Sequence, residues 1–66
     1  MQIMVNGKWE QKAEALSVAG LLRELSLDSR RVAVELNRGI LPRAQYAGTV
    51  LNDQDQLEIV TLVGGG

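Results

Sequence analysis

Leu57-Glu58-Ile59-Val60-Thr61-Leu62-Val63 runs directly into Gly64-Gly65-Gly66. The first seven residues are rich in Leu, Ile and Val, which is typical of a strand. A strand that is buried on one face sets the direction in which the following residues leave the fold. Glycine has no Cβ, so the three glycines fit a channel only as wide as a peptide. From Val63 onward an extended tail reaches at most ~14 Å.

This ending has two interpretations. The glycines form either a functional tail that carries a carboxyl group into the active site of another protein, or a frayed terminus or expression remnant. The remainder of the chain discriminates between them.

The first residues predict a hairpin. Met1, Ile3 and Val5 alternate with polar or less apolar neighbours, which indicates a half-buried strand. Asn6-Gly7 is a strong signal for a type I′ turn, because both central residues of that turn need positive φ. The return strand, residues 8–12, carries lysines as edge strands often do. We expect Trp9, Gln11 and Ala13 to face inward.

An amphipathic helix is expected next, followed by shorter elements. Val18, Leu21, Leu22 and Leu25 form one apolar stripe, Ser17 is placed to cap the first turn, and the helix should end near Ser26. Gly20 suggests close approach of the helix to a sheet, and Leu27 should fold back onto the core.

The remaining predictions are a strand over 32–36, a turn at 37–39, a short apolar pair at 40–41, a helical turn from Pro42 through Tyr46, and a polar turn over 52–55.

These elements predict an α+β fold. A helix that covers one face of a small mixed sheet, with the first and last strands side by side in the middle, is the β-grasp or ubiquitin-like architecture. We expect a β-grasp domain over residues 1–63 and a flexible glycine tail over 64–66. Tyr46 and Trp9 are expected to cover the edges of the core.

The sheet face opposite the helix has no element to cover it. If Leu57 and Ile59 face the helix, Val60 and Leu62 face away from it, beside Met4. Exposed apolar groups near a functional end suggest a protein-binding patch, to which we also assign Val63. Scattered surface aliphatic residues are the alternative.

Composition excludes several functions. The 66 residues contain no cysteine and no histidine, and the formal net charge is −1. A thiolate metal site, a histidine base, a bound cofactor and a nucleic-acid or membrane-binding role are therefore not expected. Asp53 and Asp55 lack the further oxygen donors of a calcium loop and should be turn formers. Arg30, Arg31, Arg38 and Arg43 form a docking surface for an acidic partner or, more simply, a solvated face. We expect a small soluble protein of the cytoplasm.

The distinctive chemical group is the carboxylate of Gly66. A carboxylate is a poor acyl donor until ATP converts it to an acyl adenylate, from which AMP leaves when a sulfur or nitrogen nucleophile attacks. A partner enzyme with Mg²⁺ can supply this chemistry, so the chain needs no catalytic residues of its own.

The chain resembles the sulfur carrier proteins of thiamin biosynthesis, the ThiS family. The resemblance spans the whole sequence, and its most specific part is a strand that leads into a terminal Gly-Gly. The other matching segments are residues 1–8, 18–22, 32–37, 40–43, Tyr46 and 58–60.

The resemblance implies a β-grasp fold and adenylation of Gly66 by an E1-like activating enzyme that uses ATP and Mg²⁺, with Gly64 and Gly65 giving access. It further implies a thiocarboxylate whose sulfur comes from cysteine through a desulfurase and passes to thiazole synthase. One departure is Gln54-Asp55, where the family often has Gly-Asp.

Three alternatives remain open at this point. They are a sulfur carrier for molybdopterin synthesis, a ubiquitin-like modifier conjugated through Gly66, and an interaction module with an idle tail.

Overall fold

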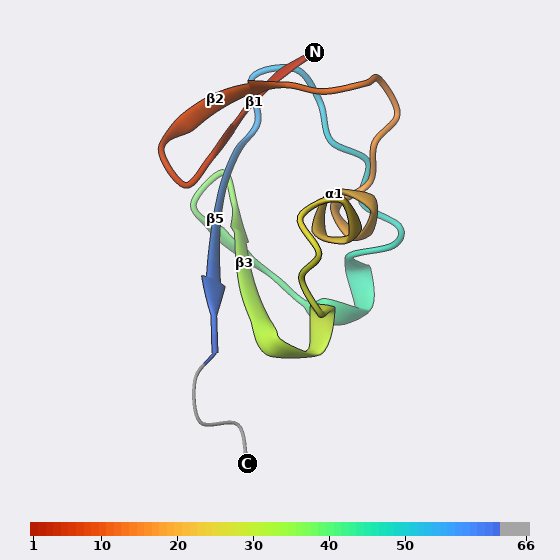
Figure 1. Ribbon diagram of the computed structural model, residues 1–66, viewed down its shortest axis with the longest axis vertical. Helices are drawn as coiled ribbons and strands as arrows, with labels where there is room; N and C mark the ends of the chain where they lie inside the picture. The colour runs from red at the N-terminus through yellow and green to blue at the C-terminus, as the bar shows by residue number, and fades with distance from the viewer. Residues whose placement is uncertain (63–66) are drawn as a thin grey trace.

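The computed structural model describes residues 1–62, so Val63 and the glycines expected to form the tail lie outside the described residues. Figure 1 shows one helix packed on one side of a twisted sheet. The elements in chain order are β1 (Gln2–Val5), β2 (Lys8–Gln11), α1 (Val18–Glu24), the 3₁₀ turn η1 (Ser29–Arg31), β3 (Val32–Leu36), β4 (Gly39–Leu41), the 3₁₀ turn η2 (Arg43–Gln45) and β5 (Gln56–Thr61).

The strand order is β2-β1-β5-β3-β4. β1 and β5 are parallel neighbours at the centre, whereas the other pairs are antiparallel. This is the predicted β-grasp arrangement, with the first and last strands side by side. In the described part of the chain, the sheet face opposite α1 carries no helix (Figure 1).

The core lies between α1 and the inner face of the sheet. Alternate residues of each strand point inward because successive side chains of a strand lie on opposite faces. Each fully buried aliphatic side chain contributes about 1.5–3 kcal/mol relative to exposure. The buried hydrophobic residues are Ile3, Val5, Val18, Leu21, Leu22, Val32, Val34, Tyr46, Leu51, Leu57 and Ile59.

Two predictions about the core were wrong. Tyr46 belongs to the core, with 4% of its surface exposed, and does not lie at its edge. The turn η2 turns this residue inward, and its carbonyl accepts a hydrogen bond from the backbone N–H of Ala19 in α1. Leu25, predicted to belong to the buried stripe, is exposed because α1 ends before it.

The ends of α1 are stabilised by local hydrogen bonds. Ser17 is the N-cap, as predicted, and its hydroxyl accepts from the backbone N–H of Gly20 at 3.0 Å. At the other end Ser26 has φ of +59°, and the N–H groups of Ser26 and Leu27 donate to the carbonyls of Arg23 and Leu22. This pairing is a Schellman motif, which ends the helix and brings Leu27 back onto the core.

Gly20 has a different role from the one expected. A Cβ at this position would lie 3.0 Å from Leu16 Cδ1 and 3.3 Å from Ser17 Oγ. The close neighbours thus belong to the segment before α1 and not to the sheet.

The second strand faces the opposite way from our prediction. The Asn6-Gly7 turn contains two residues, with φ of +51° and +83°, so Val5 pairs with Lys8 and Met4 with Trp9. Residues opposite each other in a ladder share a face. Trp9 therefore lies on the outer face with Met4 and is 43% exposed. Gln11 and Ala13 are exposed as well.

Candidate functional site

The final strand leaves the fold from a fixed position. β3 pairs with β5 along its length, from Leu36 opposite Leu57 to Val32 opposite Thr61. One residue further, the N–H of Leu62 donates to the carbonyl of Arg31 at 2.7 Å. The chain therefore remains tied to the fold up to the last described residue, at the end of the molecule opposite the N-terminus (Figure 1).

Two asparagines hold β5 from its two sides. Asn6 accepts from the N–H of Ile59 at 2.7 Å and donates to its carbonyl at 3.2 Å, on the side where β1 has already ended. Asn37 accepts from the N–H of Gln56 at 2.9 Å. Both belong to hairpin turns in which they adopt positive φ. The turns thus close the hairpins and also position the central strand.

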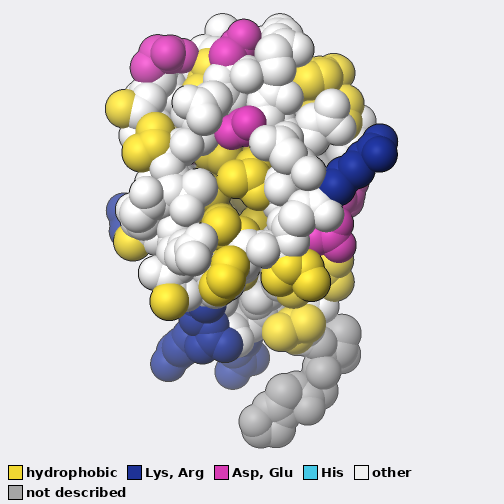
Figure 2. All heavy atoms as spheres, turned by 180° about the vertical axis from the view of Figure 1, so that it is seen from behind, with side chains coloured by type: hydrophobic (Ala, Val, Ile, Leu, Met, Phe, Trp, Pro, Cys, Tyr) yellow, Lys and Arg dark blue, Asp and Glu magenta, His cyan; other side chains and the backbone are white. Residues whose placement is uncertain are grey.

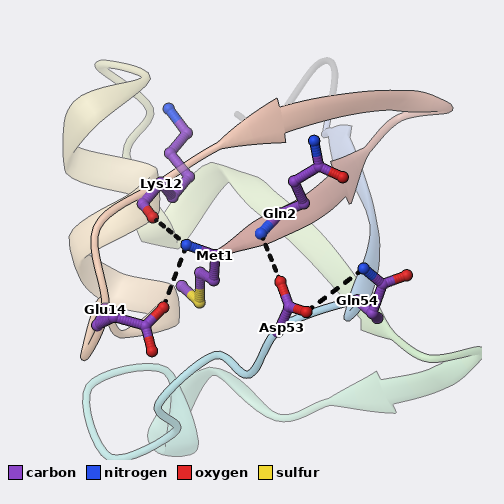
Figure 3. Close-up of polar contacts among 6 residues, drawn as sticks. All are labelled: Met1, Gln2, Lys12, Glu14, Asp53 and Gln54. Carbon is purple, nitrogen blue, oxygen red and sulfur yellow. Dashed lines mark hydrogen bonds and ion pairs between the residues drawn. The ribbon is translucent and has the colours of Figure 1, made fainter.

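Figure 3 shows how the start of β1 is anchored. The Met1 ammonium donates to the carbonyl of Lys12 at 2.9 Å and pairs with the Glu14 carboxylate at 3.1 Å. The Asp53 carboxylate accepts from the N–H of Gln2 at 2.6 Å, and this hydrogen bond lowers the pKa of Asp53 below its ordinary 3.8. The loop before β5 is therefore fastened directly to β1.

The polar turn before β5 has a structural role, as predicted. The Asp55 carboxylate accepts from the N–H of Asn52 at 2.8 Å and from the side chain of Asn37 at 2.9 Å. Gln54 has φ of +75°, so the position that departs from the family's Gly-Asp has the backbone conformation that favours glycine. Residues 1–62 contain no group of three acidic side chains that could hold a metal ion.

Two of the predicted binding residues, Val60 and Leu62, lie on the outer face of the sheet. Val60 and Leu62 are 58% and 50% exposed, while Leu57 and Ile59 are buried. The orientation that the sequence predicts for β5 is thus confirmed. Figure 2 shows hydrophobic side chains at the surface toward the lower end of the molecule, where the described chain stops.

Met4, however, does not lie beside Val60. β1 pairs with β5 only at its start, where Met4 is opposite Gln56 and Val5 opposite Leu57. Val60 is four residues further along β5, roughly 13 Å away at the rise of a strand. Apart from Ile40 on the edge strand β4, the apolar side chains of the outer face therefore fall into two areas. We call Met4 with Trp9 the β1–β2 area, and Val60 with Leu62 the β5 area.

Trp9 lies on the outer face and not inward as predicted, although the sequence contains a signal for this orientation. A two-residue Asn-Gly turn requires Val5 to face Lys8, and hence Met4 to face Trp9. Between the two apolar areas, Glu35 and Glu58 are direct partners across β3 and β5. Like charges in this position destabilise a sheet slightly. Ile40, opposite Glu35, is 82% exposed at the edge strand β4.

The other features bear on how the chain can act. Gly64, Gly65 and Gly66, predicted to carry the chemistry, and Val63 lie outside the described residues. Within residues 1–62, no helix is long and apolar enough to span a membrane. The sequence has no histidine or cysteine for catalysis. The features that residues 1–62 offer to a partner are the outer face of the sheet and the fixed direction of β5.

Comparison with known proteins connects this arrangement to a family. The model of the ThiS family matches residues 3–66. The chain is 33% identical over 66 residues to the sulfur carrier protein ThiS of Escherichia coli (strain K12), with both proteins covered in full. It is also 46% identical over 66 residues to a thiazole synthase of Paramagnetospirillum magneticum (strain ATCC 700264 / AMB-1), and this match covers all of the chain but 20% of the thiazole synthase.

The fold agrees with a solved structure of the same kind. The crystal structure of the thiamine biosynthesis protein (ThiS) from Geobacter metallireducens matches with a TM-score of 0.85 and 38% sequence identity, and the match covers both chains in full. This agreement confirms the β-grasp fold. Since the family model covers nearly the whole chain and full-length relatives share its size, the chain belongs to the ThiS family.

Proposed function

We propose that this protein is a sulfur carrier for thiamin biosynthesis whose C-terminal Gly66 is converted to a thiocarboxylate. The observation that carries the proposal is the match to the ThiS family over residues 3–66, which includes the three glycines. The full-length similarity to a sulfur carrier protein and to a thiamine biosynthesis protein supports it. A carrier of this kind is a co-substrate and not an enzyme, and we place it in the cytoplasm.

The proposed chemistry occurs at the acyl carbon of Gly66. A carboxylate oxygen attacks the α-phosphorus of ATP, pyrophosphate leaves, and an acyl adenylate forms. A persulfide of the sulfur donor then attacks the acyl carbon, and AMP leaves with the bonding electrons. A thiol reductant cleaves the S–S bond of the resulting acyl disulfide, which releases the thiocarboxylate of Gly66. The partner activating enzyme supplies Mg²⁺ and the groups that stabilise the phosphate charge. Gly64 and Gly65 give the carboxyl group access because they add no side chain to the tail.

Three partners follow from this proposal. They are an E1-like activating enzyme, a cysteine desulfurase or related sulfur donor, and thiazole synthase as acceptor. The thiazole synthase assignment has support of its own, because a region of the Paramagnetospirillum magneticum enzyme is 46% identical to this entire chain. In that enzyme a similar region is covalently part of the synthase.

We assign partner docking to the β5 area, which comprises Val60 and Leu62, with Val63 next to it. These two described residues are half or more exposed on the uncovered face and immediately precede the tail. A protein that takes Gly66 into its active site comes within ~14 Å of Leu62, since four extended residues span no more. We treat Met4, with Trp9, as a more distant area of the same face.

The test is an intact-mass measurement after incubation with ATP, Mg²⁺, an activating enzyme of the ThiS pathway, a sulfur donor and a thiol reductant. We expect a gain equal to the replacement of one oxygen by sulfur, which is absent when Gly65 and Gly66 are deleted. The deletion variant should unfold at the same urea concentration as the parent, which shows that the loss is chemical.

Further outcomes separate the alternatives. Consumption of the thiocarboxylate by thiazole synthase supports the thiamin pathway, whereas its rejection there and use by molybdopterin synthase would move the carrier to that pathway. Covalent attachment of Gly66 to lysines of other proteins would favour a modifier. No mass change, with an activating enzyme that is active on its own carrier, would overturn the proposal.

A further inference from the structure

Arg31 lies at the point where β5 leaves the fold. Its carbonyl accepts the hydrogen bond of the Leu62 N–H at 2.7 Å, and the next residue, Val32, is opposite Thr61. The Arg31 side chain is exposed and has no ion-pair partner within residues 1–62. No described carboxylate forms a salt bridge with it, although its charge helps to lower the pKa of Asp28.

The neighbouring arginine behaves differently. Arg30 makes two hydrogen bonds to the Asp28 carboxylate, from Nε at 3.2 Å and from Nη2 at 3.0 Å. These contacts lower the pKa of Asp28 from 3.8 to about 2 and raise the pKa of Arg30. The charge of Arg30 is thus compensated by a direct ion pair, whereas Arg31 acts on the same carboxylate without a direct contact.

A second arginine without a salt bridge among the described residues lies toward the same end of the molecule. β4 ends at Leu41, opposite Val34, and runs toward the start of β3, so η2 follows near that end. Arg43 in η2 is exposed, and no described acidic group pairs with it. On the face shown in Figure 2, lysine and arginine side chains gather at this lower end, with no acidic side chain visible among them.

We propose that Arg31, together with Arg43, docks on an acidic surface of the activating enzyme beside the channel that receives the tail. This inference rests on the proposed function, because only a partner that takes Gly66 must approach within ~14 Å of Leu62. Any such partner meets Arg31, whose backbone is bonded to Leu62. An opposite charge there accelerates encounter and fixes orientation.

The overall charge favours a protein partner over a polyanion. The net charge is −1, and acidic residues are spread over the rest of the chain, including the Glu35–Glu58 pair on the outer face. The chain lacks the strongly basic surface that nucleic-acid binding requires. Arg31 and Arg43 form a small basic area, and a small acidic area on a folded protein has the complementary charge.

The test is steady-state kinetics of sulfur transfer to wild-type and variant carriers. We expect Arg31→Glu to lower kcat/KM about tenfold at low salt with kcat unchanged, and Arg31→Glu combined with Arg43→Glu to lower it further. Arg31→Lys keeps the charge and should retain most of the wild-type kcat/KM. The difference between wild type and Arg31→Glu should shrink at ~1 M salt, where the Debye length falls to about 3 Å.

Arg38→Glu is the matched control. Arg38 is exposed in the β3–β4 turn, at the opposite end of β3 from Arg31, and its reversal changes the net charge by the same amount. Two outcomes overturn this inference alone, provided that the wild-type carrier gains sulfur. In the first, Arg38→Glu lowers kcat/KM as much as Arg31→Glu does. In the second, Arg31→Glu leaves kcat/KM unchanged. If the wild-type protein gains no sulfur, the proposed function fails and this inference fails with it. Far-UV circular dichroism verifies that each variant is folded.

Discussion

Alternate residues of the same strands lie on the two faces of the sheet, where one set is buried against the helix and the other is exposed. On β5, Leu57 and Ile59 are buried against α1, whereas Glu58 and Val60 are exposed on the other side. On the three central strands the inner face is apolar except for Thr61, whereas the edge strand β2 places Lys8 and Glu10 opposite Val5 and Ile3. The outer face has two apolar areas with the Glu35–Glu58 pair between them.

This difference separates stability from recognition. Inner residues are chosen for packing, and changing them lowers the free energy of unfolding. Outer residues contribute little to the fold, and a like-charge pair at the centre of the sheet even costs some stability. Substitutions on the outer face can therefore be used to examine partner binding in a protein that remains folded.

The largest effect is expected on the inner face. Leu57→Ala removes most of a side chain that is 1% exposed and should lower the free energy of unfolding by about 2–5 kcal/mol, measured by urea unfolding. The matched change Val60→Ala, three residues along the same strand, should cost no more than about 0.5 kcal/mol. Similar losses at both positions would contradict the division of β5 into two faces.

Next in size is a change of binding on the outer face. Val60→Lys should weaken docking to the activating enzyme at least tenfold, about 1.4 kcal/mol, with little change in stability. Val50→Lys is the control, because Val50 is also exposed, at 53%, but lies in the segment after η2. Isothermal titration calorimetry measures both dissociation constants. Equal binding by the two variants would remove the β5 area from the docking surface.

The loop that sets the position of β5 offers an intermediate effect. Gln54 has φ of +75°, which costs a non-glycine residue about 1 kcal/mol or somewhat more. Gln54→Gly should therefore raise the free energy of unfolding by up to ~1 kcal/mol, partly offset by the entropy of the unfolded chain. The same substitution in strand β2, Gln11→Gly, should lower it. A loss of stability at Gln54 would refute the explanation by backbone strain.

A smaller gain is expected from the outer-face acidic pair. Glu35→Lys places opposite charges across β3 and β5, where Glu58 is the direct partner, and should raise the free energy of unfolding by about 0.2–1 kcal/mol. Thermal unfolding at low and high salt measures this gain. If the pair is repulsive, salt should reduce the difference between the variant and the parent protein.

The anchor between the loop and β1 predicts a modest acid dependence. The pKa of Asp53 in the folded protein lies below its ordinary 3.8, because the carboxylate accepts from the Gln2 N–H. The unfolded chain therefore binds more protons near that value, so stability is present above about pH 4 and is lost as pH falls toward the folded pKa. In Asp53→Asn, the free energy of unfolding measured with urea should fall less steeply as pH is lowered below 4. The remaining pH dependence should include that of Asp28, whose pKa is about 2. An unchanged slope would show that the hydrogen bond does not contribute.

Local patterns in the sequence predicted much of the fold and part of the candidate site. The alternation in β1, β3 and β5, the Ser17 cap and the Asn6-Gly7 turn each depend on residues close in sequence, and the structure agrees with them. The exposure of Val60 follows from the same alternation. The docking role of the β5 area and the chemistry of Gly66 remain predictions.

Other features depend on contacts between distant segments. Tyr46 is buried because η2 turns it into the core beside α1, and no periodic pattern surrounds it in the sequence. Met4 and Val60 lie on the same face of the sheet but are not neighbours, because β1 ends opposite Leu57. The parallel register that causes this is set by long-range hydrogen bonds, including those of Asp53 to Gln2 and of Asn6 to Ile59.

The sequence by itself determined which residues of β1, β3 and β5 face the helix, where the strands turn and that the last strand leads into glycines, since period and turn chemistry act over a few residues. The tertiary structure alone decided how β1 and β5 are aligned, that the outer face has two apolar areas, and that Arg31 lies beside Leu62. The reason is that pairing of distant strands depends on closing long loops and packing a shared core, neither of which is encoded in a short pattern.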